Sequence, residues 1–169
     1  KKAILKNGEI YIASGTIKDY QGKKQFNVTD FRVALDEEIE KDSFYEYAPL
    51  TKVELQTKIS GYINKIQNKN LKTIVYTVLK KHVDDFFEYP AAVSIHHNFI
   101  SGLAYHVYSM LTLSDVYLKL YSYLNSDLVY AGIILHDIGK VKELSGSKGV
   151  EYTKIGNLLG HITIGANMV

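Results

Sequence analysis

The chain contains no cysteine and carries a formal net charge of only +2 over 169 residues. Without cysteine no disulfide framework can form, and no apolar segment typical of a secretory signal follows the first lysine. The sequence is therefore interpreted as cytoplasmic. The longest apolar runs, such as residues 130–135, are far shorter than the roughly 18 to 20 residues that cross a bilayer, which predicts no membrane association.

Arginine is also scarce, since Arg32 is the only one among 20 basic residues. Bidentate guanidinium recognition therefore cannot be the main mode of phosphate binding. The small net charge does not indicate nucleic-acid binding, which usually shows as a clearly basic patch. The 14 tyrosines could stack on bases, but tyrosine is also an ordinary core and rim residue. Composition thus neither excludes nor establishes a nucleic-acid partner.

The N-terminal region has the pattern of a β-hairpin. Residues 8–35 contain two alternating segments joined by a turn at 19–23, in which Gly22 can take positive φ. Because two strands alone are marginal in water, we expect them to pair with strands outside this chain or to pack on helices. The acidic stretch 36–42 and the Ala48-Pro49 step predict a linker after the hairpin.

Helical periodicity begins after this linker, and 46% hydrophobic content suffices for a packed core. Thr51 and Glu54 have capping-box spacing, Ser126-Asp127 is expected to cap a helix, and Gly139 is expected at a helix C′ position. The last apolar pattern is still periodic where the sequence stops, which predicts a fragment. The predicted fold is mainly α, with helices at 52–68, 71–88, 98–121, 128–138 and 153–169.

The segment 135–140, LHDIGK, places two metal-ligand types side by side at the end of an apolar helix. An ionised carboxylate in an apolar setting needs a cation or several hydrogen bonds, and a divalent metal supplies the charge directly. The two oxygens of Asp137 could also bridge two ions. A bare His-Asp pair is common by chance, however, as a capping aspartate beside a structural histidine.

Two further histidines change that interpretation. His106 is expected to share a helix face with the apolar residues Leu103, Val107 and Met110. His161 is expected to do the same with Leu158, Leu159 and Ile162. Each alone is more often a core histidine with one hydrogen bond. Together with His136 and Asp137 they predict a shared metal. His82 has no such partners and is interpreted as a packing or rim histidine.

These motifs also resemble a known family. Residues 96–106, HHNFISGLAYH, resemble the HH…GGL…EH segment of the YhaM family of bacterial 3′→5′ exoribonucleases, and residues 132–140 match its HD motif. Segments 143–146, 151–153 and 156–162 continue the match in order, and residues 8–35 resemble the last strands of the family's OB-fold. Ser101 and Tyr105 stand where the family commonly has Gly and Glu, and the chain ends before the distal Asp of the superfamily.

The resemblance implies an HD-domain helical bundle preceded by a β-hairpin from a partial OB-fold. The expected domains are 1–47 for the OB part, 48–93 for a helical linker and 94–169 for an HD domain truncated at its C-terminus. The implied activity is metal-dependent 3′→5′ hydrolysis of single-stranded RNA, or single-stranded DNA, to nucleoside 5′-monophosphates. Imidazole and carboxylate ligands suit Mn, with Fe, Co or Zn as alternatives, better than Mg.

Residue roles follow from this resemblance. His106, His136 and Asp137 would hold the primary ion, and His161 would hold a second ion bridged by Asp137. The site would act by metal-assisted attack of water on the phosphodiester.

Substrate contacts are assigned to other residues. Lys140 would hold a phosphate oxygen, with a solvated surface lysine as the alternative. His97 would bind substrate or protonate the leaving group, with a structural role as the alternative. The hairpin would contact the nucleic acid through candidate stacking and backbone-binding side chains, which are Tyr11, Tyr20, Phe26, Lys18, Lys23 and Lys24.

Two other functions stay open at this point. An HD phosphohydrolase could act on nucleotides or on cyclic mono- or dinucleotides, and the motif alone does not separate these substrates from RNA. A metal-free regulatory or nucleic-acid-binding module is the alternative from another class. The sequence also leaves a homo-oligomer open.

Overall fold

The computed structural model describes residues 5–40, 43–94 and 96–169, so part of the expected linker at 36–42 lies outside the described residues. The chain divides into two compact units, 1–44 and 45–169. The first contains a β-hairpin and the second contains the helices, which confirms the predicted class of a mainly α chain with an N-terminal hairpin. None of the helices in the described ranges is both long and apolar enough to cross a membrane.

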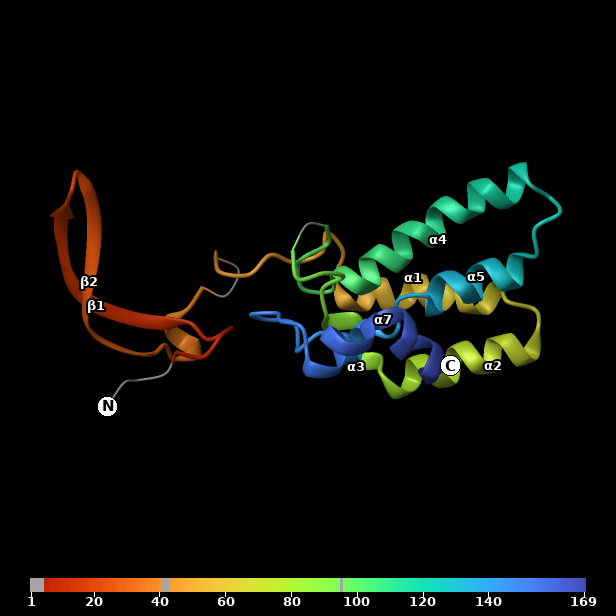
Figure 1. The fold of residues 1–169 in the computed structure, drawn as a ribbon. Coiled ribbons are helices and arrows are strands. Elements are labelled where there is room, and N and C mark those ends of the chain that lie inside the picture. Colours follow the sequence, from red (N-terminus) through yellow and green to blue (C-terminus); the bar gives the residue numbers. More distant parts are fainter. Residues whose placement is uncertain (1–4, 41–42, 95) are drawn as a thin grey trace. The chain divides into compact units, whose positions relative to one another are not determined.

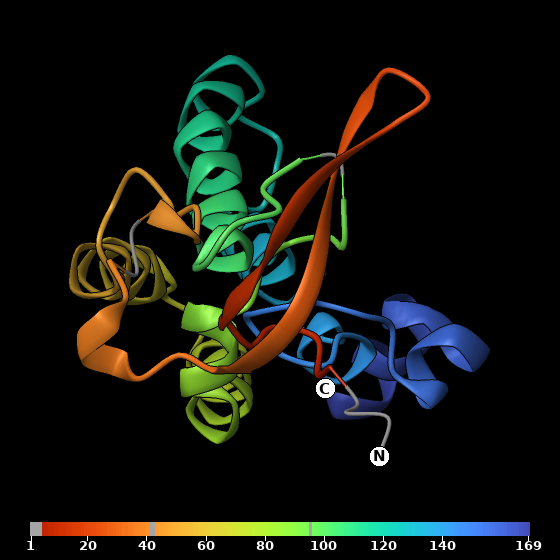
Figure 2. The same ribbon diagram turned by 90° about the vertical axis from the view of Figure 1, so that its left-hand side faces the viewer.

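The hairpin consists of β1 (Tyr11–Tyr20) and β2 (Lys23–Val33), which pair antiparallel. Its turn is two residues long, and both Gln21 (φ 53°) and Gly22 (φ 77°) have positive φ. Such turns match the right-handed twist of the strands they connect, and the ribbon is visibly twisted (Figure 2). The Asp19 carboxylate accepts a hydrogen bond from the Gly22 N–H at 3.0 Å, which fixes the turn.

The register separates the hairpin into an apolar and a polar face. The cross-strand pairs on one face are Tyr11↔Val33, Ala13↔Phe31, Gly15↔Val28, Ile17↔Phe26 and, beside the turn, the charged pair Asp19↔Lys24. Those on the other face include Thr16↔Asn27, Lys18↔Gln25 and Tyr20↔Lys23. Because paired residues point to the same side of a sheet, Tyr11 and Phe26 lie among apolar side chains. Of the candidate stacking aromatics, only Tyr20 shares a face with Lys18 and Lys23.

The helical unit contains α1 (Lys52–Lys65), α2 (Lys69–Lys81), α3 (Val83–Glu88), α4 (Gly102–Leu120), α5 (Ser126–Leu135), α6 (Lys140–Glu143) and α7 (Lys154–Met168). A short 3-10 helix, η1 (Asp36–Glu38), follows the hairpin in the first unit. The helix predicted at 71–88 is instead broken at His82, whose backbone (φ −130°, ψ 22°) is not helical.

Helix caps explain several of these boundaries. Thr51 and Glu54 form the predicted capping box at the start of α1. The expected Ser126-Asp127 cap is wrong, because Asn125 caps α5 by accepting from Leu128 N–H at 3.1 Å. The Asp127 carboxylate instead accepts hydrogen bonds from the backbone between α1 and α2, at 3.0 and 2.7 Å.

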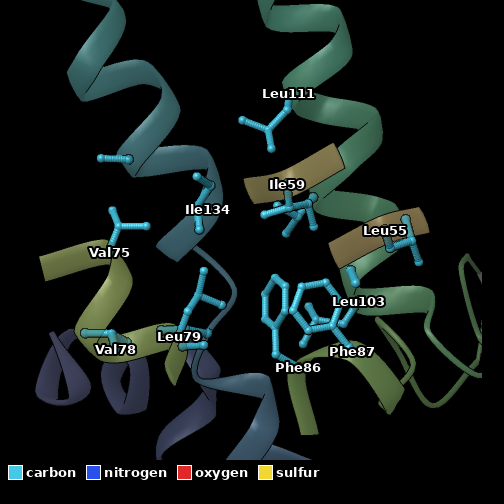
Figure 3. Packing of buried hydrophobic residues seen from close by; sticks show 14 of the residues in the cluster. Leu55, Ile59, Val75, Val78, Leu79, Phe86, Phe87, Leu103, Leu111 and Ile134 are labelled. Atoms are coloured by element: carbon cyan, nitrogen blue, oxygen red, sulfur yellow. The ribbon is translucent and has the colours of Figure 1, made fainter. Parts of the chain in front are cut away.

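The core lies between α1, α2, α3, α4 and α5, as Figures 1 and 3 show. Phe86 and Phe87 of α3 meet edge to face, with ring centroids 5.0 Å apart. Side chains from the other four helices belong to the same buried cluster, among them Leu55, Ile59, Val75, Leu79, Leu103, Leu111 and Ile134. Burial of this apolar surface fixes α4, which carries His106, and α5, which ends just before His136 and Asp137.

A polar cluster links three of these helices. The Asp115 carboxylate on α4 accepts hydrogen bonds from the hydroxyls of Tyr62 on α1, at 2.9 Å, and of Tyr130 on α5, at 2.8 Å. The Lys65 ammonium lies 3.1 Å from the same carboxylate and 4.1 Å from the centre of the Tyr62 ring. Asp115 on α4 therefore satisfies polar groups from two other helices at once.

Replacing Asp115 by Ala should destabilise the fold, because it leaves two partly buried hydroxyls without their acceptor. We expect the free energy of unfolding to fall by about 1–3 kcal/mol. Asp84→Ala is the matched control, since that side chain is 84% exposed and should change stability by no more than about 0.5 kcal/mol. Urea unfolding followed by circular dichroism measures both, and equal effects would contradict a structural role for Asp115.

Candidate metal centre

The candidate site is built around the carboxylate of Asp137, which is buried (5% exposed). α5 ends at Leu135, three residues before the predicted end, and Asp137 lies in the turn between α5 and α6. An ionised carboxylate at this depth is costly unless positive charge or hydrogen-bond donors surround it. Its surroundings therefore indicate what the site can bind.

Three imidazole rings from different parts of the chain face this carboxylate. His136 Nε2 lies 3.2 Å from Asp137 Oδ2, and His106 Nε2, from α4, lies 3.6 Å from the same oxygen. His161 Nε2, from α7, lies 3.5 Å from Oδ1. The four residues assigned to metal binding therefore lie together around the Asp137 carboxylate, but His161 is outside the group formed by His106, His136 and Asp137, whose ligand atoms lie within 4.8 Å of one another.

The proton on His136 can be assigned from its partner. Its Nδ1 lies 2.8 Å from the Ile133 carbonyl oxygen, which can only accept, so Nδ1 carries the hydrogen. A neutral ring then turns the Nε2 lone pair toward the Asp137 carboxylate. The Nε2 lone pair and the carboxylate oxygen are both acceptors, and they repel each other at this distance. The arrangement is stable only if a cation, either a second proton or a metal ion, lies between them. The donor set therefore fits a metal ion, and ligand atoms of His106, His136 and Asp137 lie within 4.8 Å of one another.

The charge states suit the same purpose. Burial lowers the pKa of His106 to about 4, so that this ring is neutral at pH 7. Burial acts to raise the pKa of Asp137, but the hydrogen bond and charge of His136 and the charge of Lys140 outweigh it, and the pKa is lowered. The hydrogen bond to Asp137 raises the pKa of His136, so that in metal-free protein Nε2 holds a proton where a metal ion would take its place. A deprotonated carboxylate beside a neutral imidazole is the state that binds a divalent ion.

Lys140 is not a solvated surface lysine. Its side chain is 11% exposed, and its ammonium lies 3.0 Å from Asp137 Oδ2 and donates to the Ala91 carbonyl at 2.6 Å. These contacts connect the segment before α4 to the carboxylate. A role of Lys140 in holding phosphate stays a prediction.

His97 lies beside His106, with ring centroids 5.3 Å apart. Its Nδ1 is buried and has no hydrogen-bond partner among the residues described, and burial lowers its pKa. His96, His97 and His106 form a second group whose ligand atoms lie within 4.8 Å of one another. Sequence reasoning missed His96, although the HH doublet offered a signal. His82 is the C-cap of α2 and is in neither group of potential ligands among the described residues.

The expectation for α7 needs correction. Residues 153–169 were predicted as one helix with His161 on its buried face beside Leu158 and Ile162. In the structure those two apolar side chains are 80% and 74% exposed. His161 nevertheless faces Asp137 because α7 is broken at Gly160, whose φ of 69° and ψ of 157° are not helical.

Gly139 also has a different role from the expected C′ glycine. Its φ of −61° is right-handed, so no left-handed conformation requires a glycine here. A Cβ at this position would instead overlap the carbonyl oxygen of His161. Glycine therefore permits the close approach of α7 that puts His161 at the site.

The lowered pKa of His106 predicts how stability depends on pH in metal-free protein. Between pH 6.5 and about 4 the unfolded chain binds a proton at His106 that the folded chain does not, so the free energy of unfolding falls as pH falls through this window. His106→Gln should flatten this dependence, measured by urea unfolding in EDTA. His96→Gln, at an exposed histidine, is the control, and an unchanged slope in the His106 variant would contradict the assignment.

Comparison with known proteins identifies relatives. No protein-family model matches the chain, and no solved structure matches it significantly. Proteins named 3′-5′ exoribonuclease YhaM are similar to it: that of Listeria welshimeri is 47% identical over 151 residues, that of Listeria monocytogenes 48% over 152, and that of Bacillus subtilis 48% over 151. Each match covers 89% of this chain and 48% of the relative, so the chain spans about half the length of these curated relatives. At this level of identity the chain is similar to the matching half of these exoribonucleases.

Proposed function

We propose that this chain forms the metal-binding part of a cytoplasmic 3′→5′ exoribonuclease of the HD type, hydrolysing single-stranded RNA, and also single-stranded DNA, to nucleoside 5′-monophosphates. The observation that carries the proposal is the buried Asp137 carboxylate, which three histidine Nε2 atoms face from 3.2 to 3.6 Å. The name of the relatives supports the choice of RNA over free or cyclic nucleotides as substrate.

The ligands divide between the two oxygens of Asp137. His106 and His136 face Oδ2 and would hold the first ion with it, whereas His161 faces Oδ1 and would hold a second. Mn²⁺ suits this mixture of imidazole and carboxylate, with Fe, Co or Zn as alternatives. Such ions, when bound, lower the pKa of coordinated water and neutralise charge on the phosphate. The chain's contribution is to fix the geometry and to keep the carboxylate deprotonated.

His97 and Lys140 are the residues proposed to contact the scissile phosphate. The unpartnered Nδ1 of His97 can donate a hydrogen bond to a phosphate oxygen or to the leaving 3′ oxygen. The Lys140 ammonium has three donors, and its contacts with Asp137 and Ala91 leave one for a phosphate oxygen.

The polar face of the hairpin is the proposed nucleic-acid surface of the first unit. Tyr20, Lys18 and Lys23 share it, so a stacking ring and two cations lie on one side. The hairpin is proposed to belong to an OB-fold, in which further strands would cover its apolar face, as a two-stranded sheet requires.

Asp137→Ala tests the proposal on RNA labelled at its 5′ end, with Mn²⁺ present. A full-length protein that contains this chain should shorten the RNA stepwise from its 3′ end. Its Asp137 variant should neither do so nor bind Mn²⁺, because the carboxylate that faces all three histidines is removed. His82→Ala, at a histidine outside the site, should keep both properties. Equal turnover by the Asp137 variant, or cleavage of free nucleotides but not RNA, would refute the proposed function.

His161→Ala separates one ion from two. If Asp137 bridges two ions, this variant should retain the first ion and lose the second. The rate of RNA hydrolysis should then fall by more than about 100-fold, which is the upper end of the effect of removing an outer-shell residue. Elemental analysis of the dialysed protein gives the number of ions per chain. An unchanged metal content would restrict the centre to the first ion.

A further inference from the structure

The break in α7 exposes a backbone group that the buried Glu143 carboxylate uses. Because Gly160 interrupts the helix, the N–H of His161 begins a new helical segment, and it donates to Glu143 Oε1 at 2.9 Å. The same oxygen lies 3.0 Å from His161 Nδ1. Glu143 is only 7% exposed. One carboxylate oxygen therefore caps the helical segment and holds the ring of its first residue.

Glu143 is itself fixed by the start of α7. The Thr153 N–H donates to the Glu143 carbonyl at 2.8 Å, and the Thr153 hydroxyl donates to the Lys142 carbonyl at 2.8 Å. A Cβ at Gly156 would overlap the Glu143 carbonyl oxygen, so glycine allows α7 to pack closely on α6. The carboxylate thus projects from a backbone that is held on two sides.

This contact decides which nitrogen of His161 is available. A carboxylate accepts hydrogen bonds, so Nδ1 must carry the proton that it donates to Glu143. Nε2 then presents its lone pair to Asp137 Oδ1 at 3.5 Å. The ring lies between two carboxylates, donating to one and facing the other with an acceptor. A cation between Nε2 and Oδ1 removes this repulsion.

We propose that Glu143 is the positioning residue of the second ion: it sets the tautomer and orientation of His161 and strengthens Nε2 as a ligand. Outer-shell carboxylates hold metal-bound histidines in this way. The inference rests on the proposed function for the existence of that ion, but it assigns to Glu143 no contact with substrate.

Two variants test it. Glu143→Gln keeps an oxygen that accepts from Nδ1–H and from the backbone but removes the charge, whereas Glu143→Ala removes both. In Mn²⁺ titration calorimetry, the first ion should bind as in wild type, and affinity for the second should fall by about 10–100-fold in the Ala variant and less in the Gln variant. Glu88→Gln, on the exposed surface of α3, is the control.

Nitrogen NMR of metal-free protein reports which ring nitrogen of His161 is protonated. A purely structural role of Glu143 would leave this tautomer unchanged. His161 Nδ1 should be protonated in wild type and Glu143→Gln, whereas Glu143→Ala should lose this preference. If His161→Ala weakens the second ion but neither Glu143 variant alters its affinity or the ring tautomer, the positioning role is wrong and the proposed function stands. If His161→Ala leaves metal binding unchanged, the second ion itself is refuted.

Should Glu143→Ala fail to fold, the Gln variant decides, because wild-type affinity for the second ion would then exclude any effect of the charge.

Discussion

The helical unit depends on one costly requirement, which is to keep an ionised carboxylate at Asp137 out of water. Three imidazoles and the Lys140 ammonium surround it, and they come from α4, from residues 136–140 and from α7. Charge in a medium of low dielectric interacts strongly, so the geometry of these groups matters more than it would on the surface. The apolar core of α1 to α5 supplies the close-packed framework that holds this arrangement in place.

Close backbone approach is the means by which distant segments reach the carboxylate. Side chains larger than hydrogen would overlap a carbonyl oxygen at Gly102, which meets His97, at Gly139, which meets His161, and at Gly156, which meets Glu143. Each glycine therefore brings α4 or α7 against a segment that carries a titratable group. These three backbone contacts determine how close the segments lie to one another. The positions of the side chains at the site depend on that spacing.

Much of this arrangement could be predicted from sequence. Periodicity identified the hairpin and the helical region, and the grouping of His106, His136, Asp137 and His161 required only their spacing and side-chain chemistry. The break at His82 and the break at Gly160 were missed, since apolar periodicity continues through both and a local backbone change leaves no mark on it. Glu143 was missed as a partner of His161 because their contact depends on that second break, and a glutamate in a charged segment otherwise indicates only a solvated surface.

The position of Lys140 has a consequence for how the site would fill. Its ammonium and the proposed first ion both require Oδ2 of Asp137, and two cations that share one oxygen weaken each other's attraction to it. If the proposed ion binds, it would loosen the lysine and make its charge available to an anion nearby. By thermodynamic reciprocity, an anion that attracts Lys140 away from Oδ2 would favour ion binding to the same degree. The proposed ion and phosphate would in this sense be cooperative ligands, coupled through a single side chain.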